Sequence, residues 1–78
     1  MKQKLINYIE KNLALATEAP NSQTAMTWYN QAFGALSFYS YTHYESHPED
    51  EAEMVKRWND EWRIKFDEAV YGKIKNRG

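Results

Sequence analysis

The C-terminal third of the chain carries the signals of one long amphipathic helix. Its start is marked by Ser46-His47-Pro48-Glu49, a Ser-x-x-Glu capping box with a proline in the first turn. Acidic residues follow directly and basic residues gather near the far end, so both sets complement the helix dipole. Bulky apolar side chains recur at helical spacing, at Met54, Val55, Trp58, Trp62, Phe66, Ala69 and Val70. We therefore predict a helix over residues 47–71 whose apolar stripe faces the core.

The end of this helix is open to two outcomes. It either stops at Gly72 in a left-handed cap or continues toward Asn76. Along one flank the charges alternate in sign at i,i+4 spacing, which predicts ion pairs between neighbours. The residues of this ladder are Glu53, Arg57, Glu61 and Lys65.

The length of the helix limits the shapes that the chain can adopt. From Glu49 to Tyr71 it would extend about 34 Å. A compact globule of 78 residues has a radius of gyration of about 11–12 Å, and hence a diameter near 30 Å. One helix is therefore as long as the expected molecule. Either the chain forms an elongated antiparallel bundle, or a second chain packs along it.

Two further helices precede this one. The breaker Glu18-Ala19-Pro20-Asn21-Ser22 separates them, and Asn21 or Ser22 is a suitable N-cap for the second. The first, over about 2–17, has the stripe Leu5, Ile9, Leu13 and Ala16, with Ile6 beside it. The second, over about 22–44, has a broad apolar face flanked by Trp28 and Tyr39: Ala25, Met26, Tyr29, Ala32, Phe33, Leu36 and Ser40. The short connections predict an all-α fold with one domain over 1–78. We expect a three-helix antiparallel up-down-up bundle with a long C-terminal helix, and dimerisation stays open.

Composition excludes several classes of protein. With 42% hydrophobic and 27% charged residues, the chain is neither disordered nor collagen-like. It has no cysteine, so it forms no disulfide and no thiolate metal site. The longest apolar runs are far below the ~20 residues that cross a bilayer. We therefore expect a cytoplasmic protein with no membrane partner.

Signs of catalysis or metal binding are weak. His43 and His47 are four residues apart, but the capping box at Ser46 predicts that the helix ends between them, so they would not share a metal. The serines lack a nucleophile-elbow context, and the glycines are too scattered to form a phosphate loop. We expect no enzyme activity, no cofactor and no metal; a metal-binding protein that depends on these histidines is the weakest alternative.

Nucleic-acid binding is the other alternative, and the charge pattern disfavours it. The net charge is −1, and the stretch from Asn21 to Asp50 has no Lys or Arg. Basic residues form two small clusters that an up-down-up bundle would place at opposite ends: Lys2, Lys4 and Lys11, and Lys73, Lys75 and Arg77. A small nucleic-acid-binding regulator would need a continuous basic surface, which this arrangement does not predict.

Aromatic residues make up 15% of the chain and are its most unusual feature. Five of them are predicted to lie in the core: Tyr29, Phe33, Trp58, Trp62 and Phe66. Another set lies off the main stripes and is predicted to form a partner surface: Phe38, Tyr41, Ile64 and Tyr71, with Ile74 nearby. The sequence therefore favours a protein–protein interaction module or a self-associating accessory or regulatory module, whose partner is a protein or a second copy.

Overall fold

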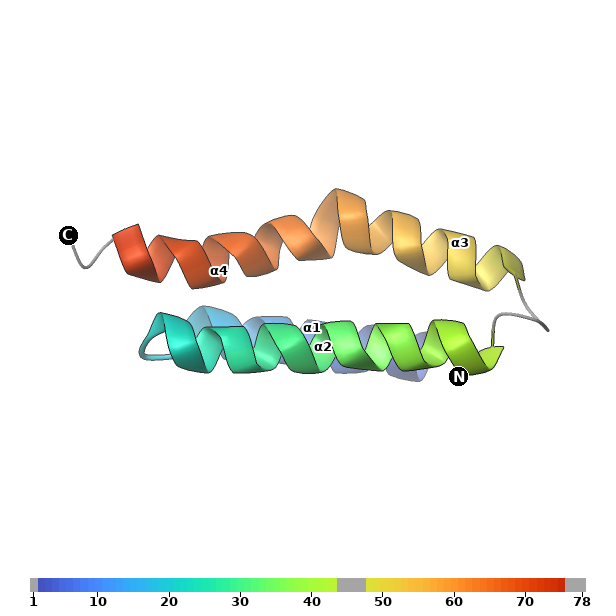
Figure 1. The fold of residues 1–78 in the computed structure, drawn as a ribbon, viewed down its shortest axis with the longest axis horizontal. Coiled ribbons are helices and arrows are strands. Elements are labelled where there is room, and N and C mark those ends of the chain that lie inside the picture. Colours follow the sequence, from blue (N-terminus) through green and yellow to red (C-terminus); the bar gives the residue numbers. More distant parts are fainter. Residues whose placement is uncertain (1, 44–47, 76–78) are drawn as a thin grey trace.

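Every secondary-structure element described for this chain is a helix. The computed structural model describes residues 2–43 and 48–75, with side chains up to residue 39 in the first range and residue 73 in the second. Its elements are α1 (Lys2–Glu18), α2 (Ser22–His43), α3 (Pro48–Arg57), the π-helix η1 (Trp58–Trp62) and α4 (Arg63–Lys75). The last three form one continuous rod, so the structure consists of three helical rods (Figure 1). The prediction of an all-α fold is confirmed.

The three rods lie side by side in an elongated molecule of 47 × 18 × 16 Å, with a radius of gyration of 13.3 Å. α2 contacts both α1 and α4, and α1 also contacts α4. Lys2 Nζ lies 2.9 Å from Glu53 Oε2 near the start of the third rod, and Lys73 Nζ donates to the carbonyl of Thr17 near its end. α1 and the third rod therefore run in the same direction, and α2 runs against both (Figure 1).

The turn between α1 and α2 follows the predicted breaker. The Asn21 side-chain oxygen accepts a hydrogen bond from the backbone N–H of Thr24 at 2.8 Å, so Asn21 is the N-cap of α2. The N–H of Ala19 donates to the carbonyl of Ala16 and closes the last turn of α1. Pro20 follows directly and prevents the helix from continuing.

The helix ends agree with the predicted ranges to within a few residues where they are described. The third rod continues through Gly72 to Lys75, and no described glycine has a positive φ. The left-handed cap is therefore not adopted, and the longer alternative holds. Ser46 and His47, which carry the predicted capping box, lie outside the described residues. Within the described part of the chain, no helix is both long enough and apolar enough to cross a bilayer.

The core runs the length of the three rods. Its buried apolar residues are Leu5, Ile6, Ile9, Ala16, Ala25, Ala32, Leu36, Tyr39, Met54, Trp58, Trp62, Phe66, Ala69 and Val70. Two residues predicted for the core are instead exposed: Phe33 at 52% and Val55 at 40%. Phe33 lies about 80° around α2 from Ala25, and Val55 about 100° around α3 from Met54. Both residues therefore lie at the edge of the apolar stripe of their helix, where the packing of the three rods leaves their side chains exposed. Tyr39, predicted to flank the core, is buried.

The π-helix in the third rod is a feature that the sequence did not predict. The N–H of Arg63 donates to the carbonyl of Trp58, the i→i+5 bond of a π turn. Met54, Trp58, Trp62 and Phe66 follow one another at intervals of four, and each such step drifts about 40° around an α-helix. The wider π turn corrects part of this drift, and it leaves both tryptophans buried.

The charged ladder of the third rod is only partly formed as predicted. Glu61 pairs with Arg57 at 3.3 Å and with Lys65 at 3.1 Å. Glu53 pairs with Lys2 of α1 instead of Arg57, and Arg57 also reaches Glu10 of α1 at 3.2 Å. The pairs of Glu53 with Lys2 and of Arg57 with Glu10 link the third rod to α1.

Candidate functional site

One side of α2 is covered by none of the other described helices. In Figure 1, α1 lies behind α2 and the third rod lies along a second side, and the remaining side faces outward. We define the α2 outer face by the exposed residues on this side: Thr27, Asn30, Phe33, Gly34, Ser37 and Phe38. At 100° per residue they span about 140° of the helix. All 22 residues of α2 lack Asp, Glu, Lys and Arg, so this face has no formal charge along its length.

Two phenyl rings border the α2 outer face. Phe38 is 70% exposed and Phe33 is 52% exposed, which makes Phe38 the most exposed large apolar side chain described. The rings project about 140° apart, and Gly34 and Ser37 lie between them. The α2 outer face is thus a strip of small and polar residues with one phenyl ring on each border.

Gly34 has no structural requirement within the described chain. It lies in the interior of α2, its φ is not positive, and a Cβ placed on it would meet nothing within 4 Å. A glycine inside a helix costs about 1 kcal/mol relative to alanine. Because the fold neither needs the glycine's conformation nor fills its space, Gly34 leaves an open gap on the α2 outer face.

Phe33 is connected to the core through a cluster of rings. Tyr29 stacks on Phe66 with the ring centroids 5.1 Å apart and the planes 9° from parallel. The ring centroid of Trp58 lies 5.9 Å from that of Tyr29, 5.7 Å from that of Phe66 and 5.6 Å from that of Phe33. The pKa of the Tyr29 phenol is raised mainly by burial and also by a hydrogen bond to Asp67. Phe33 therefore packs against the edge of this ring cluster through Trp58.

The predicted partner residues do not form a single patch. Phe38 belongs to the α2 outer face, whereas Ile64 (47% exposed) and Tyr71 (53% exposed) lie on α4. The side chain of Tyr41 lies outside the described residues. The exposed set also contains Phe33, which the sequence placed in the core; its position at the edge of its stripe is the signal that could have found it.

The distance between these groups follows from the ring stack described above. Tyr29 and Phe66 lie side by side on antiparallel helices. Phe38 is nine residues from Tyr29 toward one end of the molecule, and Tyr71 is five residues from Phe66 toward the other. At 1.5 Å per residue, Phe38 and Tyr71 are about 20 Å apart along the long axis.

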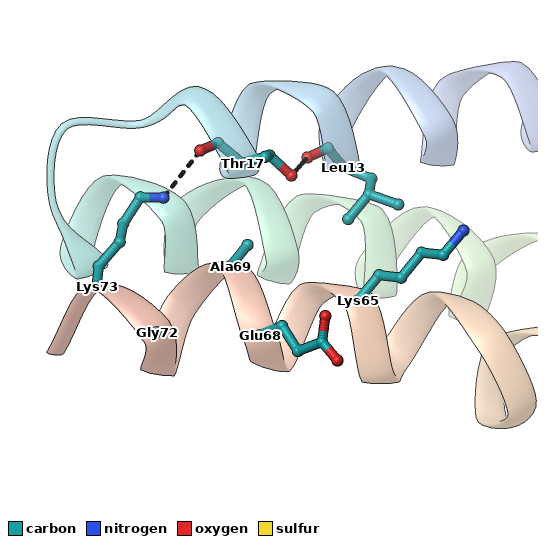
Figure 2. Close-up of a pocket in the computed structure, with 7 residues that line it drawn as sticks. All are labelled: Leu13, Thr17, Lys65, Glu68, Ala69, Gly72 and Lys73. Carbon is teal, nitrogen blue, oxygen red and sulfur yellow. Dashed lines mark hydrogen bonds between the residues drawn. The ribbon is translucent and has the colours of Figure 1, made fainter. Parts of the chain in front are cut away.

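An open groove lies between α1 and α4, with a volume of about 480 Å³ (Figure 2). Lys73 crosses it to donate a hydrogen bond to the Thr17 carbonyl at 2.9 Å, and the Thr17 hydroxyl donates to the carbonyl of Leu13. Lys65 on its rim pairs with Glu61. Both lysines are thus engaged within the chain, and the groove has no converging set of polar groups of the kind that binds a ligand.

Metal and nucleic-acid sites gain no support from the described side chains. They include no group of three or more His, Asp or Glu residues that could hold a metal ion. The side chains of His43 and His47, the histidines of the weakest alternative, lie outside the described part. Of the basic residues, Lys2 is engaged by Asp50 and Glu53, and it lies at the opposite end of the molecule from Lys73.

Comparisons with protein-family models, with curated proteins and with solved structures find no match to this chain. Among the described surfaces, the α2 outer face departs furthest from the charged surface that an exposed helix usually carries.

Proposed function

We propose that this chain is an association module, an up-down-up bundle of three helical rods that binds another protein surface through the α2 outer face. The observation that carries the proposal is a 22-residue helix with no charged side chain and with Phe33 and Phe38 exposed on it. The centres of protein interfaces are depleted in charge and enriched in aromatic residues. The side of a helix that faces water typically carries charged residues.

The remaining expectations fit this role and stay predictions. The module is expected to act in the cytoplasm, to catalyse no reaction and to need no cofactor or metal. Ile64 and Tyr71 are expected to form a second, smaller contact on α4. Nucleic-acid binding is the weaker alternative, and retention on heparin that falls steeply with salt would favour it.

Site-specific photo-crosslinking tests the proposed surface. A photoreactive phenylalanine analogue replaces Phe38 in cells that produce the chain, and a matched variant carries it at Ala14, which is exposed on α1. After irradiation, adducts are identified by mass spectrometry. We expect a discrete adduct with an identified protein from position 38 that position 14 does not give. Equal products from both positions, or none from position 38, would contradict the proposal.

A further inference from the structure

We propose that the partner of the α2 outer face is a second copy of this chain, bound antiparallel so that Phe38 of each copy lies over Gly34 of the other. This inference rests on the proposed function and names its partner. It follows from three properties of the surface: its lack of charge, the charges at the two ends of the molecule, and the gap at Gly34.

The lack of charge makes the α2 outer face complementary to itself. When two such faces meet, no ion loses its hydration. A strongly charged partner would instead lose hydration against a face that offers no counter-charge. Two identical faces related by a two-fold axis form the commonest type of oligomer contact, in which each residue contact occurs twice.

The charges at the ends of α2 select the antiparallel orientation. The first turn of α3, beside the C-terminal end of α2, holds the carboxylates of Glu49, Asp50 and Glu51, and Lys2 of α1 offsets part of this charge through its pair with Asp50. At the other end, Lys73 contacts Thr17 just before α2 begins (Figure 2). Antiparallel pairing brings the acidic end of one copy toward the basic end of the other. Parallel pairing would bring like charges together.

The register follows from the spacing of Gly34 and Phe38. They lie four residues apart, about 6 Å along α2, and 40° apart around it. A two-fold axis midway between them places the phenyl ring of each copy over the glycine of the other. The space above Gly34 is open, so a ring can enter it, and the missing Cβ allows the two helices to approach closely.

A standard interface removes about 800 Å² from each partner, which is about 15% of the 5342 Å² that the chain exposes. In the proposed register, residue i of one copy faces residue 72 − i of the other, so residues 29–43 of the two α2 helices overlap over about 22 Å. The parts of α1 and of the third rod that border the α2 outer face would contribute the rest of the area.

Glycine substitutions test the register in purified protein. Gly34→Gln is compared with Gly72→Gln, because both glycines are helical with nothing within 4 Å of an added Cβ and both gain helix propensity from Gln. Solution mass is measured by sedimentation. We expect the wild type and Gly72→Gln to form dimers of twice 9.3 kDa. Gly34→Gln should keep full helicity but associate at least tenfold more weakly. Equal association of the two variants would overturn the register.

Single cysteines test the orientation, because the chain has none of its own. In the antiparallel pair, a cysteine at Ser37 lies about 3 Å along the axis from its mate, whereas one at Thr27 lies about 27 Å away. Under oxidised glutathione, Ser37→Cys should form a disulfide dimer quickly and Thr27→Cys should not. Equally fast linkage of both would indicate a parallel pair and overturn the orientation.

The failure of this inference can be told apart from that of the proposed function. A wild-type chain that stays at 9.3 kDa at every concentration overturns the second copy as partner. In that case, an adduct between position 38 and a different protein would still support an association module. The absence of any adduct specific to position 38 would remove both.

Discussion

Gln31 of α2 donates a hydrogen bond to Asn12 of α1, with 3.1 Å between Gln31 Nε2 and Asn12 Oδ1. Asn12 is only 1% exposed, and its Nδ2 donates in turn to the carbonyl of Tyr8 at 2.8 Å. Both ends of this buried amide are therefore satisfied, as burial of a polar group requires. The bond also links α1 to α2 at a fixed register.

Replacing Asn12 with Ala should destabilise the fold. The change removes both hydrogen bonds and leaves the Gln31 amide without its acceptor, so we expect a loss of about 1–3 kcal/mol in the free energy of unfolding. Asn7→Ala is the matched control, since Asn7 is exposed on the same helix and accepts a hydrogen bond from Gln3 at the surface. Urea denaturation measures both, and equal losses would show that the buried amide has no special role.

Deleting Asn59 should convert the π-helix into ordinary α-helix without unfolding the protein. Asn59 is exposed within η1, and its loss shortens the interval from Trp58 to Trp62 from four residues to three. The apolar residues of the rod then alternate between spacings of four and three, which keeps them on one side of an α-helix. We expect unchanged helicity by circular dichroism and cooperative thermal unfolding.

The control for this deletion removes Glu68, which is exposed in regular α-helix. Its loss turns the residues that follow by about 100°, so Ala69 and Val70 leave the core and Lys73 leaves Thr17. We expect a clear drop in melting temperature. If deletion of Asn59 lowers the melting temperature as much as deletion of Glu68 does, the π-helix does not correct the drift of the apolar residues around the rod.

Truncation of Trp62 should be among the most damaging changes to the core. The side chain is 1% exposed, and Trp62→Ala should cost about 3–5 kcal/mol from lost burial and the cavity left behind. Its indole N–H is buried with no hydrogen-bond partner among the described residues. Trp62→Phe removes this donor and keeps most of the apolar contact, so it should cost much less. Equal losses in chemical denaturation would contradict this assignment.

Stability should depend on pH through Glu61. Hydrogen bonds from Lys65 and then Arg57 lower the pKa of its carboxyl below the ordinary value. A lowered pKa in the folded state stabilises the protein above the unfolded pKa, and this contribution is lost as pH falls through the folded pKa. Wild type should therefore be more stable than Glu61→Gln at pH 6, and the difference should shrink toward pH 3 in urea titrations. A constant difference would rule out the linkage.

The sequence was sufficient for the helical class and most of the core because those depend on periodicity. Ile9, Leu36 and Phe66, one from each predicted stripe, are buried as predicted. The burial of Asn12 was not predictable, since it depends on a partner 19 residues away on another helix. The exposure of Phe33 was missed for a related reason: how wide a stripe is buried depends on how the rods pack.

The candidate site was predicted in part. The position of Phe38 opposite the stripe of α2 was visible in the sequence, and it is exposed in the structure. The gap at Gly34 was not visible, because the space around a glycine is known only once its neighbours are placed. The distance between Phe38 and Tyr71 likewise required the antiparallel arrangement of α2 and α4.

Solution mass by light scattering, over a concentration series, tests association through the α2 outer face most directly. The series compares the wild type with Phe38→Lys and with Val55→Lys, which places the same charge on an exposed position of α3. We expect the wild type and Val55→Lys to rise from 9.3 kDa toward twice that mass, whereas Phe38→Lys stays at 9.3 kDa. A wild type that remains monomeric, or dissociation by Val55→Lys and not by Phe38→Lys, would contradict association through the α2 outer face.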